Sequence, residues 1–302
     1  MKRGLALAAL PLGAAAFLTR ELYRYVFCRE GSPLLAPILD SKGHEPDYYT
    51  WRENCAEALR QRPQRRFTIR SARGERLAGF YYPAGGEGKR IAFIVHGYRS
   101  EHADTAGMFF DYYASRGYDL FCCDHTAHGE SGGRQVGFDF FETEDCLLWL
   151  EELRRRFGPE IRVVLHGFSM GAATVLKMAG RCPPWVRGIV ADCGYKDGRA
   201  QLKSMLGPAY WPMRILNRLA AGYDLSETDV EQSLAASTLP ILFFHGEEDR
   251  LVPFANGPAL YALYRGEKDA LFVPGAKHME CLWVDPAGYT AKLDAFLGRW
   301  MD

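Results

Sequence analysis

The 302-residue chain has no excess of charge of either sign, because 37 lysine and arginine residues balance 37 aspartate and glutamate residues. Proteins that bind nucleic acid usually carry an excess of basic side chains, so this balance gives no reason to expect a nucleic-acid partner. The chain also lacks internal repeats and low-complexity segments. Its apolar fraction of 48% is enough for a sizeable core, and its length suits one large α/β domain or two small ones.

No C-x-x-C pair occurs among the eight cysteines, and their spacings are irregular. Cys122 and Cys123 are adjacent in an apolar run that reads as a strand. Neighbouring side chains of a strand point to opposite faces, so this pair is not expected to form a disulfide. We interpret most of the cysteines as buried free thiols, which favours a reducing compartment.

The chain lacks a long hydrophobic run. Residues 4–18 carry no charge, but a helix of these 15 residues would reach only about 22 Å, short of the roughly 30 Å hydrocarbon core of a bilayer. Three interpretations stay open: an N-terminal membrane anchor, which we favour, a signal peptide cleaved near residues 14–16, or a helix docked on the domain. The first predicts a membrane-associated protein of unknown side, and the others a secreted or a cytoplasmic one.

The order of predicted elements indicates three parts. Residues 1–30 form the N-terminal apolar segment, residues 31–66 a linker and a helix, and residues 67–302 the catalytic domain, which we expect to fold without residues 1–30. In the third part, strands alternate with helices, which predicts an α/β fold with a mostly parallel, eight-stranded sheet covered by helices on both faces. Residues 194–238 are too long for a plain loop and are predicted to form a small helical lid.

A serine motif lies at the centre of this pattern. Residues 163–173 read VVLHGFSMGAA, an apolar strand-like run that leads through a glycine to a serine, a second glycine and helix formers. This is the G-x-S-x-G pattern between a buried strand and a helix. A Cβ at Gly167 or Gly171 would crowd the turn. The turn presents the Ser169 hydroxyl to the first N–H groups of the helix, which makes Ser169 the candidate nucleophile.

A serine hydroxyl needs a base, and the base needs a carboxylate that holds its tautomer. His278 follows the last predicted strand, and Asp249 follows the strand before it. The chain order Ser169, Asp249, His278 is the one associated with this serine motif. Three other residues remain alternatives for the acid: Asp192, Glu247 and Glu248.

The remaining histidines have structural interpretations. His96, His166 and His245 lie at strand ends, and His44 and His102 are predicted to be exposed in loops. His128, with Asp124 and His125 nearby, could suggest a metal, but no third ligand accompanies Asp124 and His128. We therefore expect neither a metal nor a cofactor.

A tetrahedral intermediate carries a negatively charged oxygen, which preorganised N–H groups stabilise. We expect these donors to be the backbone N–H groups of Met170, directly after the nucleophile, and of Tyr98, after the strand at 90–95. Gly97 allows this loop to approach closely. Four residues are expected to contact the substrate: Tyr98, Phe168, Tyr195 and Trp211.

Six motifs occur in a fixed order: HGYRS at 96–100, DHTAHGESGG at 124–133, GFSMGAA at 167–173, ADCGY at 191–195, HGEEDRLVPF at 245–254 and VPGAKHME at 273–280. On these motifs the chain from residue 67 onward resembles the α/β-hydrolase superfamily. It is most similar to bacterial serine hydrolases with an N-terminal apolar segment, a group similar to esterases, lysophospholipases and serine aminopeptidases. Thr126 departs from this pattern, since the group often has arginine there.

The resemblance implies a serine hydrolase that cleaves a small-molecule carboxylic ester or thioester through an acyl-enzyme. It assigns Ser169 as nucleophile, Asp249 as acid, His278 as base, and Tyr98 and Met170 as oxyanion donors. Two alternatives stay open: an aminopeptidase-like amidase and a non-catalytic binding protein of this fold. The amidase would need a polar pocket for an amine, and the predicted lid offers acidic residues: Asp197, Asp224, Glu227, Asp229 and Glu231.

Overall fold

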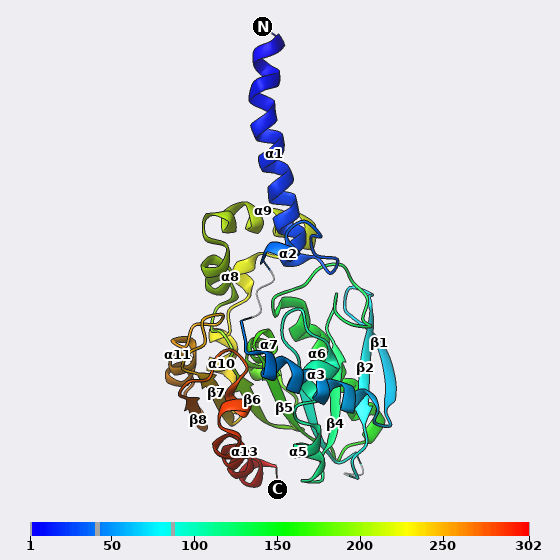
Figure 1. Cartoon of the computed structure of the whole chain (residues 1–302). Helices are drawn as coiled ribbons and strands as arrows, with labels where there is room; N and C mark the ends of the chain where they lie inside the picture. The colour runs from blue at the N-terminus through cyan, green and yellow to red at the C-terminus, as the bar shows by residue number, and fades with distance from the viewer. Residues whose placement is uncertain (1, 40–42, 86–87, 302) are drawn as a thin grey trace.

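In the computed structural model, which describes residues 2–39, 43–85 and 88–301, the chain folds around an eight-stranded sheet (Figure 1). The strands are β1 (Arg65–Arg70), β2 (Arg76–Tyr82), β3 (Arg90–Val95), β4 (Asp119–Asp124), β5 (Arg162–Phe168), β6 (Val186–Asp192), β7 (Ile241–Gly246) and β8 (Lys268–Val273). Their order is β1-β2-β4-β3-β5-β6-β7-β8, and only the pairs that involve β2 are antiparallel. The predicted mostly parallel, eight-stranded sheet is confirmed.

The register of the sheet places the ends of its parallel strands side by side. Val95 pairs with Gly167, and Phe168 pairs with Asp192, so β3, β5 and β6 end at nearly the same level. β6 to β8 continue this edge. Residues that directly follow these strands are therefore brought together, which is where open α/β sheets bind ligands.

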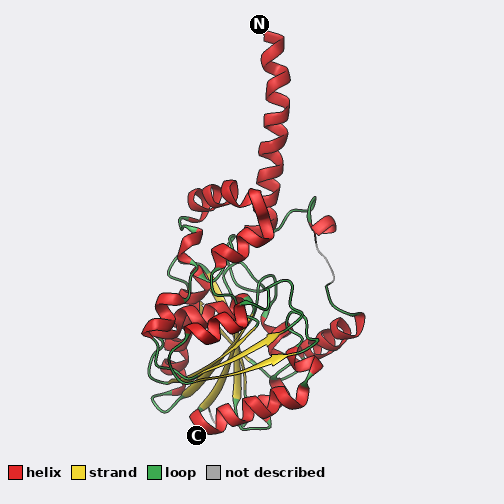
Figure 2. Ribbon diagram, turned by 90° about the vertical axis from the view of Figure 1, so that its left-hand side faces the viewer, coloured by secondary structure: helices red, strands yellow, loops and turns green. Residues whose placement is uncertain are grey.

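Helices cover both faces of the sheet (Figure 2). One face is covered by α6 (Phe140–Phe157), α7 (Met170–Met178), α10 (Glu231–Ala236) and α11 (Asn256–Leu263). The other face is covered by α3 (Pro46–Arg60), α4 (His102–Ala106), α5 (Phe110–Ala114), α12 (Cys281–Val284) and α13 (Pro286–Trp300). Because both faces are covered, the central strands are almost entirely buried, which explains their continuous apolar runs.

Two short helices, α4 and α5, connect β3 to β4. The break follows Gly107, which packs closely against α3: a Cβ on Gly107 would overlap the carbonyl group of Cys55. The close contact between α3 and the end of α4 depends on the absence of a side chain at Gly107.

The predicted insertion over 194–238 is helical. It consists of α8 (Gly198–Leu206), a 3₁₀ turn (Gly207–Ala209), α9 (Tyr210–Ala221), a second 3₁₀ turn (Leu225–Glu227) and α10. A further 3₁₀ turn, Ala179–Arg181, follows α7. The carboxylate of Asp197 caps α8 by accepting from the Ala200 N–H over 3.2 Å.

The N-terminal helix α1 (Lys2–Phe27) projects from the body of the molecule, and α2 (Ala36–Leu39) follows it (Figure 1). No helix in the described ranges combines the length and apolar character needed to cross a membrane. The end of α1 is docked on the domain, where Tyr23, Val26 and Phe27 are buried. The last residues of the segment predicted over 1–30 therefore pack on the domain. Residues 40–42 of the predicted linker lie outside the described residues.

Candidate active site

Ser169 occupies a strained turn between β5 and α7. Its backbone has φ 54° and ψ −118°, a positive-φ conformation that residues with a side chain rarely adopt. The flanking glycines are required by packing, because a Cβ on Gly167 would overlap the Gly171 carbonyl group and one on Gly171 would overlap that of Val95. The Ser169 N–H donates to the Asp192 carbonyl oxygen over 2.9 Å, which fixes the turn against β6.

Two hydrogen bonds join Ser169, His278 and Asp249. The Ser169 hydroxyl donates to His278 Nε2 over 2.9 Å, and His278 Nδ1–H donates to Asp249 Oδ2 over 2.7 Å. All three residues are buried, with exposed fractions of 9%, 8% and 4%. The structure thus brings together the three residues predicted to be nucleophile, base and acid, at distances that permit proton transfer.

The surroundings of Asp249 keep its carboxylate charged. Oδ1 accepts from the backbone N–H groups of Leu251 and Val252, each over 2.9 Å, and Oδ2 lies 3.4 Å from His245 Nε2. Burial by itself would raise the pKa of Asp249, but the hydrogen bonds from His245 and His278 outweigh it and hold this pKa well below its usual range. An ionised Asp249 can orient His278 and stabilise a positive charge on its ring.

The alternative acids do not contact His278. Asp192 Oδ2 accepts from the Tyr289 hydroxyl over 2.9 Å, and burial raises the pKa of Asp192 to about 6. Glu247 and Glu248 are exposed. Of these acidic residues and Asp249, all within the described chain, only Asp249 is hydrogen-bonded to His278.

Backbone strain is concentrated at this edge of the sheet. Five of the non-glycine residues with positive φ in the described ranges each follow a different strand: Arg99, Ala127, Ser169, Cys193 and Met279. Such conformations cost of order 1–3 kcal/mol each and cluster at functional sites. The clustering independently marks this edge as a candidate site.

The backbone near Ser169 has the arrangement expected for an oxyanion hole. Met170 is the first residue of α7, so its N–H has no carbonyl partner within the helix. A Cβ on Gly97 would lie 3.2 Å from both the Phe168 carbonyl oxygen and Ser169 Cβ, so this glycine lies directly against the turn. The following residue, Tyr98, is thereby held beside the nucleophile.

Ser169 and His278 line a cavity of about 370 Å³. Its apolar and aromatic lining includes Tyr98, Phe138, Met170, Tyr195, Met205, Leu251 and Val252. Phe168 and Trp211, predicted to contact the substrate, are not among the lining residues. Phe168 is 1% exposed and packs into the core on the α3 face of the sheet, and Trp211 is 57% exposed on α9. Phe168 has the opposite orientation because alternate side chains of β5 point to opposite faces.

The N-terminal region supplies part of the cavity wall that the sequence did not reveal. His44, Tyr49 and Arg52 line the cavity, although they precede the predicted catalytic domain. His44, predicted to be exposed, is partly buried with its Nδ1 2.6 Å from Glu280 Oε1. Burial lowers the pKa of His44. The dense aromatic run at 44–51, HEPDYYTW, is the one sequence signal that could have indicated a packed segment here.

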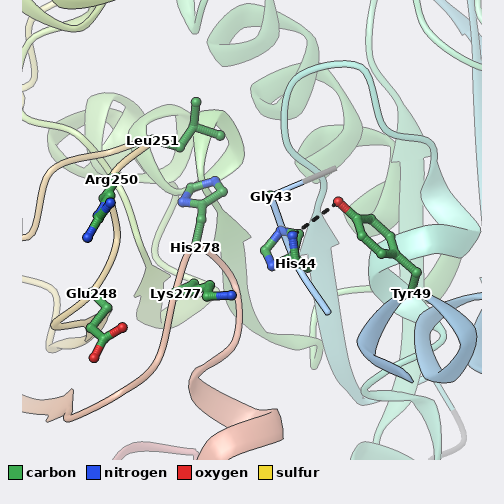
Figure 3. Close-up of a pocket in the computed structure, with 8 residues that line it drawn as sticks. All are labelled: Gly43, His44, Tyr49, Glu248, Arg250, Leu251, Lys277 and His278. Carbon is green, nitrogen blue, oxygen red and sulfur yellow. Dashed lines mark hydrogen bonds between the residues drawn. The ribbon is translucent and has the colours of Figure 1, made fainter. Parts of the chain in front are cut away.

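A second cavity of about 580 Å³ adjoins the first and shares His44, Tyr49, Leu251 and His278 with it. Figure 3 shows Leu251 and His278 on one side of it, with His44 and Tyr49 on the other. The remaining lining is polar: Gly43, Glu248, Arg250 and Lys277. His278 therefore lies where the two cavities meet, and the second cavity adds three charged side chains to the wall: Glu248, Arg250 and Lys277.

The residues considered as metal ligands make structural contacts. His128 Nδ1–H donates to the Thr126 carbonyl oxygen over 2.9 Å, and its Nε2 accepts from the Arg99 N–H over 3.2 Å. Burial lowers the pKa of His128 to about 3. Asp124 Oδ1 is bonded to the backbone and ring of His102, at 2.9 and 3.0 Å, and His102 is buried rather than exposed as predicted. These contacts join the loops after β3 and β4.

Comparison with known proteins places the chain among proteins of the α/β-hydrolase fold. Residues 86–227 match the family described as serine aminopeptidase, S33. The uncharacterized protein YqkD of Bacillus subtilis is 26% identical over 255 residues, covering 82% of this chain and 83% of that protein. Alpha/beta hydrolase domain-containing protein 17B of Xenopus tropicalis is 24% identical over 215 residues, covering 70% of this chain and 68% of that protein. The structure of the Pyrococcus furiosus esterase Pf2001 superposes with a TM-score of 0.65 at 19% identity. The superposition covers 82% of this chain and 96% of the esterase chain.

Proposed function

Because the chain belongs to the α/β-hydrolase superfamily, we propose that it is a serine hydrolase that cleaves a carboxylic ester or thioester through an acyl-enzyme. The observation that carries the proposal is the continuous hydrogen-bonded series from the Ser169 hydroxyl through His278 to Asp249. A purely structural serine would not require a buried base and a buried carboxylate aligned behind it on a strained turn.

In the proposed reaction, His278 Nε2 takes the Ser169 proton as the hydroxyl oxygen attacks the substrate carbonyl carbon. The tetrahedral oxyanion accepts hydrogen bonds from the N–H groups of Met170 and Tyr98, and loss of one such donor typically costs about 3–4 kcal/mol. His278 then protonates the leaving alcohol or thiol. Water attacks the acyl-enzyme in the same way, with His278 again as base and Asp249 ionised throughout.

An ester is favoured over the N-terminus of a peptide because the cavity offers little to hold a free ammonium group. The acidic residues of the insertion do not line the cavity. Asp104 does line it, but this carboxylate lies 3.5 Å from the Arg60 guanidinium, and Arg52 and Arg99 add positive charge to the wall. Asp197 is paired with Arg199 over 2.8 Å, Asp224 with Arg214 over 2.9 Å, and Glu231 with Lys196 over 3.2 Å. The mainly apolar lining is suited to an acyl chain or an aromatic acyl group, and the esterase Pf2001 has a similar fold.

Labelling with a fluorophosphonate probe tests this proposal directly. An active serine hydrolase should be modified at Ser169 in the wild type and not in Ser169→Ala. A panel of esters of graded acyl length beside aminoacyl amides then separates esterase from aminopeptidase activity. Absence of labelling in folded protein would favour a non-catalytic binding protein of this fold.

A further inference from the structure

Helix α9 is amphipathic, but an apolar stripe lies on its outer face. Tyr210, Met213 and Asn217 are buried against the domain. Trp211, Ile215 and Leu219 follow one another at four-residue intervals on the opposite side and are 57%, 62% and 78% exposed. Exposed stripes of large apolar side chains usually mark an interaction surface.

Helix α1 lies beside this stripe and also carries exposed apolar side chains. It packs against α9, and Figure 1 shows it leaving the body of the molecule beside that helix. On α1, Phe17 and Leu18 are 51% and 54% exposed. We call the set Phe17, Leu18, Trp211, Ile215 and Leu219 the α1–α9 face.

Two basic side chains beside the α1–α9 face are available to a ligand. Helices α8 and α9 contain four basic residues and no acidic one, but Arg199 and Arg214 are ion-paired with Asp197 and Asp224, which leaves Lys203 and Arg218. Arg218 is exposed, and it has no ion pair with any residue that the structure describes. Lys203 Nζ lies 5.2 Å from the ring centroids of both Tyr210 and Trp211. Large apolar side chains with basic neighbours are the composition of helices that lie in a membrane interface.

We propose that the α1–α9 face lies on the surface of an anionic lipid bilayer, with Trp211, Ile215 and Leu219 among the acyl chains and Arg218 and Lys203 at the lipid headgroups. The charge favours this occupant over a second copy of the chain, because two copies meeting through this face would bring their basic residues together. The assignment concerns a helix that lies in the interface, and it does not depend on a spanning segment.

The location of the face also bears on the substrate, and this step rests on the proposed function. Met205 lines the cavity that contains Ser169, is itself 45% exposed, and precedes α9 by a single turn. The proposed lipid surface is therefore continuous with the cavity wall. We infer that the substrate is an amphiphilic ester that reaches the cavity from the lipid surface.

Quenching of tryptophan fluorescence tests the lipid contact without reference to activity. The full-length protein is mixed with phosphatidylcholine vesicles containing about one third phosphatidylglycerol, with or without bromine on the acyl chains. Brominated acyl chains should quench part of the tryptophan emission of the wild type. This quenched part should come from Trp211 and should therefore be absent in Trp211→Phe. Arg218→Gln should weaken vesicle binding about fivefold, since one basic residue near such a surface contributes about 1 kcal/mol.

Matched variants test whether the apolar side chains of α9 contribute to the lipid contact. Ile215→Ser combined with Leu219→Ser should abolish most of the quenching of Trp211, whereas Leu148→Ser, which alters an exposed leucine on α6, should leave it unchanged. Arg187→Gln, at an exposed site on β6, is the control for Arg218→Gln. Hydrolysis of a water-soluble ester should be the same in all these variants, so loss of the lipid contact and loss of catalysis are distinguishable.

Two results would overturn the proposal. Vesicle binding without quenching of Trp211 by brominated chains would show that α9 is not at the lipid. A dimer in light scattering that becomes monomeric in the Ile215→Ser, Leu219→Ser variant, with Trp211 unquenched, would assign the face to a second copy. If binding and quenching occur but amphiphilic esters are not cleaved faster than soluble ones, only the inference about the substrate fails.

Discussion

The Tyr98 hydroxyl donates a hydrogen bond to the Val26 carbonyl oxygen over 2.9 Å. One residue belongs to the loop beside the nucleophile and the other to the docked end of α1. The Tyr98 ring also stacks on Phe138, with ring centroids 5.1 Å apart, and Phe27 packs edge-on against Phe138 at 5.3 Å. The N-terminal helix therefore supports the wall of the candidate active site.

Phe27→Ala should lower the free energy of unfolding by about 3 kcal/mol, because Phe27 is fully buried and its removal leaves a cavity. It should also reduce activity, since Phe138 lines the pocket. Chemical denaturation and ester hydrolysis measure the two effects. Phe17→Ala on the exposed part of α1 is the control, and its stability should change by less than about 0.5 kcal/mol.

Ser169→Gly should abolish hydrolysis and at the same time stabilise the fold by about 1 kcal/mol or more, because glycine adopts a positive φ without strain. Ser169→Ala should be equally inactive without the gain in stability. Thermal unfolding of both variants beside the wild type checks this. Equal melting temperatures for the two variants would mean that the turn stores no strain.

Asp249→Asn should lower kcat by about 10⁴-fold, because the amide favours the wrong tautomer of His278. Asp192→Asn should have a much smaller effect, since Asp192 is bonded to Tyr289 and not to His278. Steady-state kinetics on one ester compares them. If the Asp192 variant were the inactive one, our assignment of the acid would be wrong.

Glu142 is a buried carboxyl group, and burial raises its pKa to about 8. The unfolded chain releases this proton near pH 4.3, so the folded state binds more protons between the two values and its stability falls as the pH rises. Burial also gives Asp139, Asp145 and Asp192 pKa values of about 6 and lowers the pKa of five histidines: His44, His96, His125, His128 and His166. The histidines contribute a change of the opposite sign near pH 6.5, so the effect of Glu142 is obtained as the difference between the wild type and a variant that lacks this carboxyl group.

Relative to Glu142→Gln, the wild type should lose stability between about pH 6 and 8, by up to about 1.4 kcal/mol per pH unit, because only the wild type carries this carboxyl group. Urea denaturation across this range provides the measurement. Glu160→Gln, at an exposed site, should keep the wild-type pH dependence. A difference in stability between the wild type and Glu142→Gln that stays constant over this interval would contradict the predicted protonation of Glu142.

The sheet and the contacts of Ser169 could be predicted because they depend on local patterns. Buried strands read as apolar runs, and Ser169, Asp249 and His278 each follow a strand end, where the parallel topology brings them together. Thr126 occupies a position where the resemblance leads one to expect arginine. Its hydroxyl donates a hydrogen bond to Asp145 Oδ2 over 2.6 Å, so Asp145 has a partner without an arginine at this position.

The cavity walls could not be predicted because they depend on contacts between distant residues. Nothing in the sequence connects His44 with Glu280, or Val26 with Tyr98. The orientation of Phe168 was missed because proximity to Ser169 in sequence does not determine the face to which a strand side chain points. The docking of the end of α1 stayed one of three interpretations, because a short apolar segment is compatible with an anchor, a signal peptide and a docked helix.

The pairing of His44 with Glu280 has a consequence for biosynthesis. The ribosome makes Ser169 before Asp249, and Asp249 before His278, so a nascent chain that has already formed the serine turn still lacks its proposed base. Until Glu280 emerges, His44 also lacks this hydrogen-bond partner. Catalytic competence should therefore arise late in synthesis, which would spare the cell a reactive serine on incomplete chains.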